Sequence, residues 1–218
     1  MIISSGRGYI FVHIPKTGGT SLAMALEDRA HKDDILIGDT PKAVKRRNRL
    51  KGVTTKGRLW KHSTLADIEG ILPEDQLAPL KVFTLIRNPW DRLVSYYHWL
   101  REQSFLHPAV ALAKSLDFDR FLGHPVIADS IRSNDYPSYV TTSDGVEQPC
   151  SYLKLEDPDA ALDAFEAHLG FRPDLGHENA SDRARDWRGY YSDLTAGLVA
   201  DICAKDIARF GYSFDPEK

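Results

Sequence analysis

The sequence predicts an α/β fold with a central, mainly parallel sheet flanked by helices. Two observations predict it. Strand-like apolar runs alternate with stretches of helical apolar spacing, and a helix-start signal follows each of the two clearest strands. Strands joined through a helix lie parallel in one sheet with right-handed crossovers. With 218 residues, 42% of them hydrophobic, the chain is sized for a single domain over residues 1–218.

The first strand is expected at residues 9–14, an aromatic and β-branched run between Gly8 and Pro15. A turn rich in glycine and hydroxyl groups follows at residues 18–21. Apolar residues at helical spacing come directly after it. The segment therefore predicts a strand, a tight turn and a helix.

The second strand is expected at residues 81–86, and a strong helix start follows it. Asn88 suits the N-cap, Pro89 the first helical position and Asp91 the first turn. Residues 90, 93, 94, 97 and 100 then give one apolar face at helical spacing. This segment predicts the second strand–helix unit.

Two later helices are marked by similar residues at their ends. One runs from the Asp157-Pro158 pair to Gly170, and the other runs from Ser192 to Gly211. We expect irregular loops at residues 39–62 and 105–150, because both are rich in turn residues.

The composition excludes several classes of protein. With 27% charged residues and 42% hydrophobic ones, the chain is not a disordered tail, a collagen-like repeat or a coiled coil. No run approaches the roughly 18 apolar residues of a membrane span. Two cysteines, Cys150 and Cys203, are too few for a disulfide framework or a four-cysteine zinc site. We expect a cytoplasmic protein.

A basic segment stands out against the net charge of −3. Residues 42–61 hold nine lysines and arginines and no acidic residue. Such a segment on an acidic body favours a polyanionic or phosphorylated ligand over general nucleic-acid binding. A solvated loop without a ligand is the alternative.

The turn after the first strand carries the strongest functional signal. Successive glycines let the backbone approach an anion, and the N–H groups of a helix start point toward it. A lysine and three hydroxyls add donors around the glycines. The residues concerned are Lys16, Thr17, Gly18, Gly19, Thr20 and Ser21.

The turn departs from the P-loop of nucleotide triphosphatases. That motif places a Lys-Ser/Thr pair after its glycines, whereas Lys16 precedes them here. The second strand ends in Arg87 and not in an aspartate that could hold Mg²⁺. We therefore expect a nucleotide anion without a metal. A nucleotide kinase with a degenerate P-loop remains a weaker alternative.

A second phosphate site is expected at the start of the next helix. Arg87 stands between strand and helix, and Ser95 follows eight residues later. A guanidinium and a hydroxyl so placed can hold a phosphate group.

Together these motifs resemble a known family. Residues 15–21 resemble the 5′-phosphosulfate loop of sulfotransferases, and residues 87–95 resemble their 3′-phosphate motif. The resemblance is closest to the carbohydrate-type, sulfotransferase 2 family. It extends to residues 61–64, 177–181 and 210–214. It implies a P-loop-kinase-like sulfotransferase fold, and transfer of a sulfuryl group from 3′-phosphoadenosine-5′-phosphosulfate (PAPS) to an acceptor hydroxyl, without a metal.

The resemblance also implies roles for individual residues. Lys16 would stabilise charge on the leaving phosphate, and the turn from Thr17 to Ser21 would cradle the 5′-phosphate. Arg87 and Ser95 would hold the 3′-phosphate. Asn179 and Ser181 would belong to a loop over the nucleotide.

His62 is the candidate catalytic base, because it matches the histidine that some members of the family use. A histidine suits proton removal near neutral pH. Glu27 or a later carboxylate is the alternative. We expect a glycan or glycolipid acceptor, with a small metabolite or a tyrosine hydroxyl as alternatives. A polyanion-binding module without catalysis is the competing class of protein, and no nucleic acid is expected as a partner.

Overall fold

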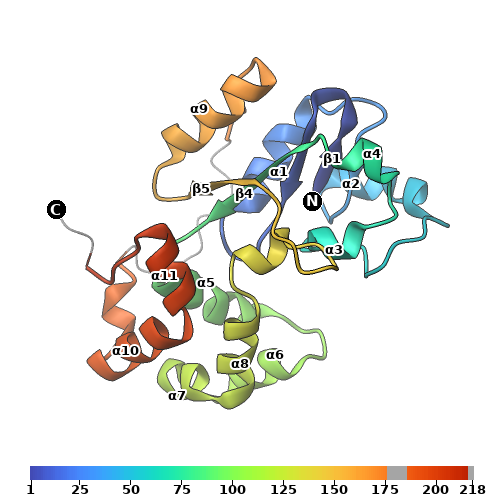
Figure 1. Ribbon diagram of the computed structural model, residues 1–218. Coiled ribbons are helices and arrows are strands. Elements are labelled where there is room, and N and C mark those ends of the chain that lie inside the picture. The colour runs from blue at the N-terminus through green and yellow to red at the C-terminus, as the bar shows by residue number, and fades with distance from the viewer. Residues whose placement is uncertain (176–185, 216–218) are drawn as a thin grey trace. The chain divides into compact units, whose positions relative to one another are not determined.

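The computed structural model describes residues 1–175 and 186–215. The chain forms two compact units, each described here by itself (Figure 1). The sheet unit comprises Met1–Ile86 and Tyr136–Ala180. The helical unit comprises Arg87–Asp135 and Ser181–Lys218.

The sheet unit is built on five strands in the order β3-β1-β2-β4-β5. They are β1 (Ile2–Ser4), β2 (Tyr9–Val12), β3 (Ile35–Leu36), β4 (Lys81–Ile86) and β5 (Cys150–Lys154). The longer ladders, β2 with β4 and β4 with β5, are parallel, and the short pairings of β1 with β2 and β3 are antiparallel. The predicted α/β fold with a mainly parallel sheet is confirmed, with an antiparallel edge that the sequence patterns did not reveal.

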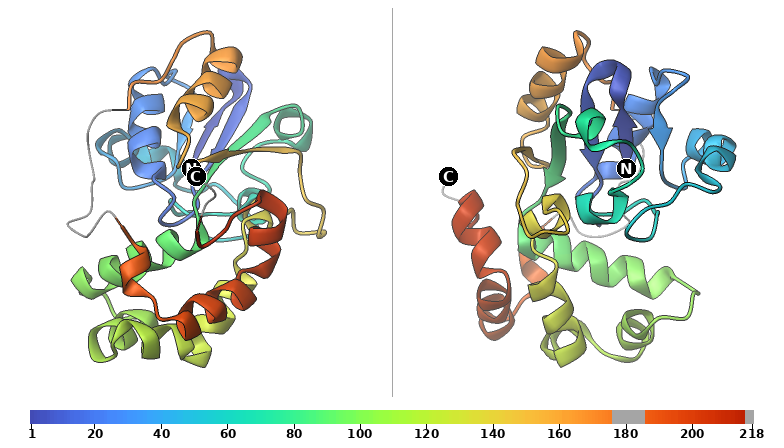
Figure 2. Two further views of the ribbon diagram at one scale, coloured as in Figure 1. Left: turned by 90° about the vertical axis from the view of Figure 1, so that its left-hand side faces the viewer. Right: turned by 45° about the vertical axis from the view of Figure 1, so that its right-hand side comes forward.

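The helices of the sheet unit are α1 (Gly19–Asp28), α2 (Pro41–Arg46), α3 (Leu65–Ile68), α4 (Glu74–Leu77) and α9 (Pro158–Leu169). Figure 2 shows α1 and α9 along the same face of the sheet. Leu22 of α1 and Phe165 of α9 share one core cluster with Phe11 of β2 and Phe83 of β4. Phe83 and Phe165 stack with their ring centroids 4.6 Å apart. This core fixes the two central strands whose ends carry the candidate site.

The helical unit contains α5 (Pro89–Glu102), α6 (Pro108–Ser115), α7 (Phe118–Gly123), α8 (Pro125–Ser133), α10 (Asp193–Ile202) and α11 (Ala204–Phe210). Its core is rich in aromatic rings. The indole N–H of Trp90 donates to the carbonyl of Ala196 over 3.0 Å, and the Tyr191 hydroxyl donates to the carbonyl of Trp90 over 2.8 Å. These bonds tie α5 to the chain around α10.

The predicted starts of α5 and α9 are confirmed. The Asn88 side chain accepts a hydrogen bond from the backbone N–H of Trp90 over 3.1 Å, with Pro89 at the first helical position. The Asp157 side chain caps α9, and Gly170 ends it in the left-handed conformation at φ 74°. Local capping chemistry was sufficient to place both helices.

Two other expectations were wrong. Residues 105–150 are not mainly irregular, because they contain α6, α7 and α8. The prolines at positions 108 and 125, which resembled loop residues, stand at the first turn of α6 and α8, where the missing N–H costs nothing. The helix expected from Ser192 to Gly211 is interrupted at Cys203, whose backbone leaves helical geometry at φ −101°, ψ 16°. Within residues 39–62, α2 likewise replaces part of the expected loop.

Candidate active site

The turn after β2 is held in a strained, fixed shape. Lys16 adopts φ 66°, and no other non-glycine residue among those described has a positive φ. Such a conformation costs of order 1–3 kcal/mol and persists only where the surroundings impose it. The Thr17 hydroxyl donates to the carbonyl of Ile14 over 2.9 Å, and Thr17 is fully buried. The Thr17 hydroxyl proton therefore serves the turn itself, and its backbone N–H is the group left for a ligand.

Both glycines of the turn are required by close packing. Gly18 has φ 81°, and a Cβ there would lie 2.6 Å from Cδ1 of Leu155. A Cβ at Gly19 would lie 2.3 Å from Cδ2 of His13. These residues let the chain enter α1 directly beside the strand end.

The start of α1 has the features of an anion site. Its N-cap, Gly18, offers no side-chain hydrogen bond, and no acidic residue stands in the first turn. Thr20 and Ser21, both half-buried, bring hydroxyls to this end of the helix. The positive end of the helix dipole and the first N–H groups therefore lie together with two hydroxyl-bearing residues, and Lys16 stands two residues before the N-cap. This arrangement fits a phosphate or sulfate group.

The structure brings His62 to this turn through His13. Nδ1 of His62 lies 2.7 Å from the carbonyl oxygen of His13, and the two ring centroids are 4.6 Å apart. A carbonyl oxygen only accepts, so Nδ1 carries the proton and donates it. Nε2 of His62 then holds the lone pair, which is the form a general base requires. His13 is thus in contact with both the candidate base and Gly19 of the turn.

Both imidazoles are kept neutral by their surroundings. Burial, together with the nearby positive charge of Lys61, lowers the pKa of His62 to about 4, although its bond to the His13 carbonyl opposes the shift. Burial lowers the pKa of His13 well below its usual value, and His62, Lys61 and Lys16 act in the same direction.

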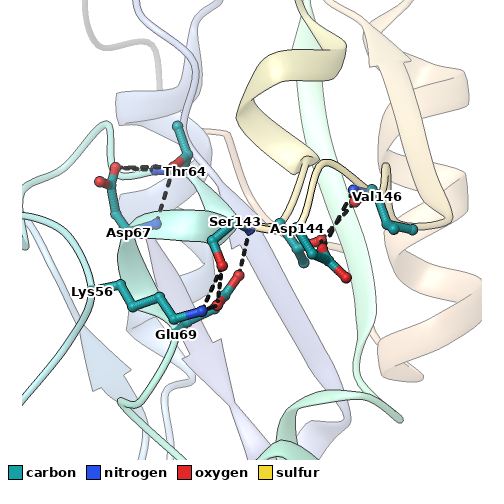
Figure 3. A network of polar contacts seen from close by, with 8 residues as sticks. Lys56, Thr64, Asp67, Glu69, Ser143, Asp144 and Val146 are labelled. Carbon is teal, nitrogen blue, oxygen red and sulfur yellow. Dashed lines mark hydrogen bonds and ion pairs between the residues drawn. The ribbon is translucent and has the colours of Figure 1, made fainter.

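The segment that carries His62 is anchored by polar contacts (Figure 3). The Glu69 carboxylate accepts from the backbone N–H of Ser143 over 2.6 Å and from its hydroxyl over 2.7 Å, and it pairs with Lys56 at 2.5 Å. Thr64 and Asp67 form a capping box at the start of α3. The segment is therefore bound on both sides of His62.

Most of the basic segment is neutralised or bonded internally. Lys61 pairs with Asp39 at 2.7 Å, and Arg46 donates to the carbonyl of His31 over 2.7 Å. Lys42 and Arg49 donate to the backbone carbonyls of Glu27 and Lys32. Lys45, Arg47, Lys51 and Arg58 are exposed. The segment is therefore less available to a polyanion than its sequence indicates.

The contacts of Glu27, the alternative base, indicate a role in holding the fold together. It is 5% exposed within α1, and its two carboxylate oxygens lie 2.8 and 2.6 Å from the Thr40 hydroxyl. Burial raises the pKa of Glu27 against the opposing effect of that hydrogen bond. Its position ties α1 to the cap of α2.

The second motif lies in the helical unit. Nε and Nη2 of Arg87 lie 2.7 and 2.6 Å from Oδ2 of Asp91, which fixes the orientation of the guanidinium. The Arg87 side chain is 13% exposed, and Ser95 of α5 is 5% exposed. A guanidinium has five N–H donors, so a carboxylate partner leaves it able to bind a phosphate as well.

Several expectations concern residues beyond these two motifs. Asn179 and Ser181 lie outside the described residues. Within residues 1–175 and 186–215, no group of three or more histidine, cysteine or acidic side chains has the arrangement of a metal site. No helix in the same ranges has the length and apolar character needed to cross a membrane.

Sequence reasoning missed three residues around the turn. His13 was expected only to pack in its strand, but its carbonyl and ring join His62 to Gly19. Leu155, after β5, packs against Gly18. Trp60 lies against His62 with ring centroids 5.0 Å apart. Only Trp60 carried a signal, as a tryptophan two residues before the candidate base.

We predict that Gly19→Ala destabilises the protein by about 1–3 kcal/mol, because the buried His13 ring occupies the space of the new Cβ. Urea unfolding measures the effect. Gly197→Ala in α10 is the matched control, since a Cβ there meets no atom within 4 Å. It should be neutral or slightly stabilising. Equal stability of the two variants would contradict the packing described for the turn.

We predict that stability falls as pH drops from about 6.5 toward 4. The unfolded chain takes up protons on both histidines near their ordinary pKa, whereas the folded chain keeps them neutral, so protons favour unfolding in this window. Replacing His62 by Gln should reduce this dependence. Histidine ring NMR gives the direct check, and a His62 midpoint near 6.5 would contradict the burial described here.

The sequence and the fold of this chain can be compared with those of known proteins. No curated protein matches the sequence. One solved structure, mouse sulfotransferase SULT7A1 complexed with PAP, is 16% identical and aligns over 92% of this chain and 84% of that one, with a TM-score of 0.45. The model of the sulfotransferase family matches residues 1–147, which include the turn after β2, His62 and the Arg87 motif. The chain therefore belongs to the sulfotransferase family, as its two motifs predicted.

Proposed function

We propose that the protein transfers a sulfuryl group from PAPS to a hydroxyl of a carbohydrate or glycolipid acceptor. The observation that carries the proposal is the position of His62. Its Nδ1 is bound to the carbonyl oxygen of His13, which leaves the lone pair on Nε2, and His13 packs on the glycine turn. A proton acceptor and an anion-binding turn thus meet at one residue of the sheet unit, in a chain of the sulfotransferase family.

In this proposal the donor is held by two sets of residues. The turn binds the 5′-phosphosulfate through the backbone N–H groups of Thr17, Gly18 and Gly19 and the hydroxyls of Thr20 and Ser21. Arg87 and Ser95 bind the 3′-phosphate, which distinguishes this nucleotide from ATP. Asn179 and Ser181 are also proposed to bind the donor. The whole chain, residues 1–218, then acts as one sulfotransferase domain.

The transfer step follows from these roles. Nε2 of His62 removes the proton of the acceptor hydroxyl as its oxygen forms a bond to sulfur. The bond between sulfur and the bridging oxygen of the 5′-phosphate breaks, and 3′,5′-bisphosphoadenosine (PAP) leaves with that electron pair. Lys16 and the N–H groups of the turn stabilise the negative charge that develops on the leaving phosphate. The proposed reaction uses no metal.

A cytoplasmic location is part of the proposal and rests on the two cysteines. Cys150 is half-buried, Cys203 is buried, and neither forms a disulfide within the described residues. Burial raises the pKa of Cys203 to about 12, so this thiol is inert at neutral pH.

The proposal is tested by His62→Ala in an assay of sulfate transfer from labelled PAPS. Loss of a general base should slow turnover by about 10²–10⁴-fold. PAP affinity, measured by calorimetry, should stay within about twofold of the parent, because the turn is unchanged. Parental turnover in this variant would remove His62 from the role of base.

We also predict that Arg87→Ala weakens PAP binding by about 1.5–3 kcal/mol, the usual value of hydrogen bonds to a charged group. Calorimetry of PAP measures it directly. Arg101→Ala is the matched control, because Arg101 is an exposed arginine of α5, the helix that begins two residues after Arg87, and it packs over the ring of Tyr97. Equal PAP affinity in the two variants would exclude Arg87 from the phosphate site.

A further inference from the structure

Trp60 is an exposed aromatic side chain placed directly beside the candidate base. It is 44% exposed, although an indole ring is usually largely buried. Its ring meets that of His62 edge to face, with centroids 5.0 Å apart and planes at 85°. The donor-binding roles proposed above make no use of it. An exposed apolar ring next to a catalytic group is the expected place for a substrate to pack.

The backbone holds Trp60 in place. The Ser63 hydroxyl, which is fully buried, accepts from the backbone N–H of Trp60 over 2.9 Å. The same hydroxyl lies 2.8 Å from the carbonyl oxygen of Trp60 and 2.9 Å from that of Arg58. The backbone N–H of Ser63 also donates to the Trp60 carbonyl over 3.0 Å. The backbone that carries the indole is therefore a turn fixed by hydrogen bonds, and not a loose loop.

A positive charge also lies near the Trp60 ring. Cζ of Arg58 is 5.8 Å from the Trp60 ring centroid, and Arg58 is exposed. Whereas Lys56 and Lys61 on either side of it pair with Glu69 and Asp39, Arg58 makes no ion pair within the described part of the chain. The guanidinium therefore remains available to a bound anion.

We infer that Trp60 and Arg58 form the acceptor platform, and that the acceptor is a pyranose ring bearing a carboxylate. The C–H face of the sugar would pack on the indole, Arg58 would bind the anionic substituent, and a ring hydroxyl would meet Nε2 of His62. This inference rests on the proposed function. Because His62 and Arg58 both adjoin one indole ring, the reacting hydroxyl and the anion belong to the same or an adjacent small ring. An anionic sugar meets that requirement.

The test uses PAPS-dependent sulfation of three kinds of probe: unsulfated uronate oligosaccharides (hyaluronan, chondroitin and oligogalacturonate), neutral maltohexaose, and an acidic peptide containing tyrosine. We expect a uronate oligosaccharide to be the best acceptor. Trp60→Ala should raise its KM by about tenfold or more, with kcat changed much less, and Trp60→Phe should restore most of the affinity. Arg58→Gln should raise the KM by about tenfold.

Matched controls separate this inference from its alternatives. Arg47→Gln removes another exposed arginine of the basic segment, and Phe105→Ala removes an aromatic ring of similar exposure, 48%. Both should leave the KM within about twofold of the parent. A fall in kcat alone for Trp60→Ala would overturn the inference and make Trp60 a positioning residue for His62. A loss of PAP affinity in the same variant would overturn it by assigning the indole to the nucleotide.

The results with the parent protein show whether the acceptor inference alone fails or the proposed function fails as well. If the parent binds PAP but no uronate oligosaccharide is sulfated, or if maltohexaose or the peptide is preferred, the acceptor inference fails and the proposed function stands. If the parent does not bind PAP, the proposed function itself fails, and the inference fails with it.

Discussion

The hydrogen bond from Nδ1 of His62 to the carbonyl oxygen of His13 is the interaction on which the candidate site depends. It joins the end of β2 to a segment that lies far away in the sequence. It also fixes the tautomer of His62, so that the basic nitrogen is the one turned away from His13. Since the His13 ring packs on Gly19, a single residue sets the position of both the glycine turn and the candidate base.

Burial and charge explain why this arrangement is suited to binding an anion. The two neutral imidazoles add no positive charge near neutral pH, so Lys16 and the start of α1 supply the field at the turn. Much of the basic segment is paired within the sheet unit, and its role is largely to secure that unit. Beside His62 lie an exposed indole, that of Trp60, and the Arg58 guanidinium, which makes no ion pair within the described residues; we propose that these two groups select the acceptor.

The sequence predicted those parts of the molecule that depend on local chemistry. The turn after β2 and the capped start of α5 were found because glycine, proline and asparagine have few other uses in such positions. The short strands β1 and β3 and the helices α6 to α8 were missed. The two strands have only three and two residues, and the prolines that begin α6 and α8 resemble loop residues. The contact of His13 with His62 could not be foreseen, because tertiary packing alone brings the two together.

Calorimetric titration of the parent protein with PAP, in the absence of metal, tests the central claim most directly, with ATP and Mg²⁺ titrated alongside. The account predicts PAP binding with a Kd in the micromolar range, about −8 kcal/mol, and much weaker binding of ATP, which lacks the 3′-phosphate. Binding of ATP alone, dependent on Mg²⁺, would contradict the assignment of the turn and of Arg87 and would point to a kinase-like activity.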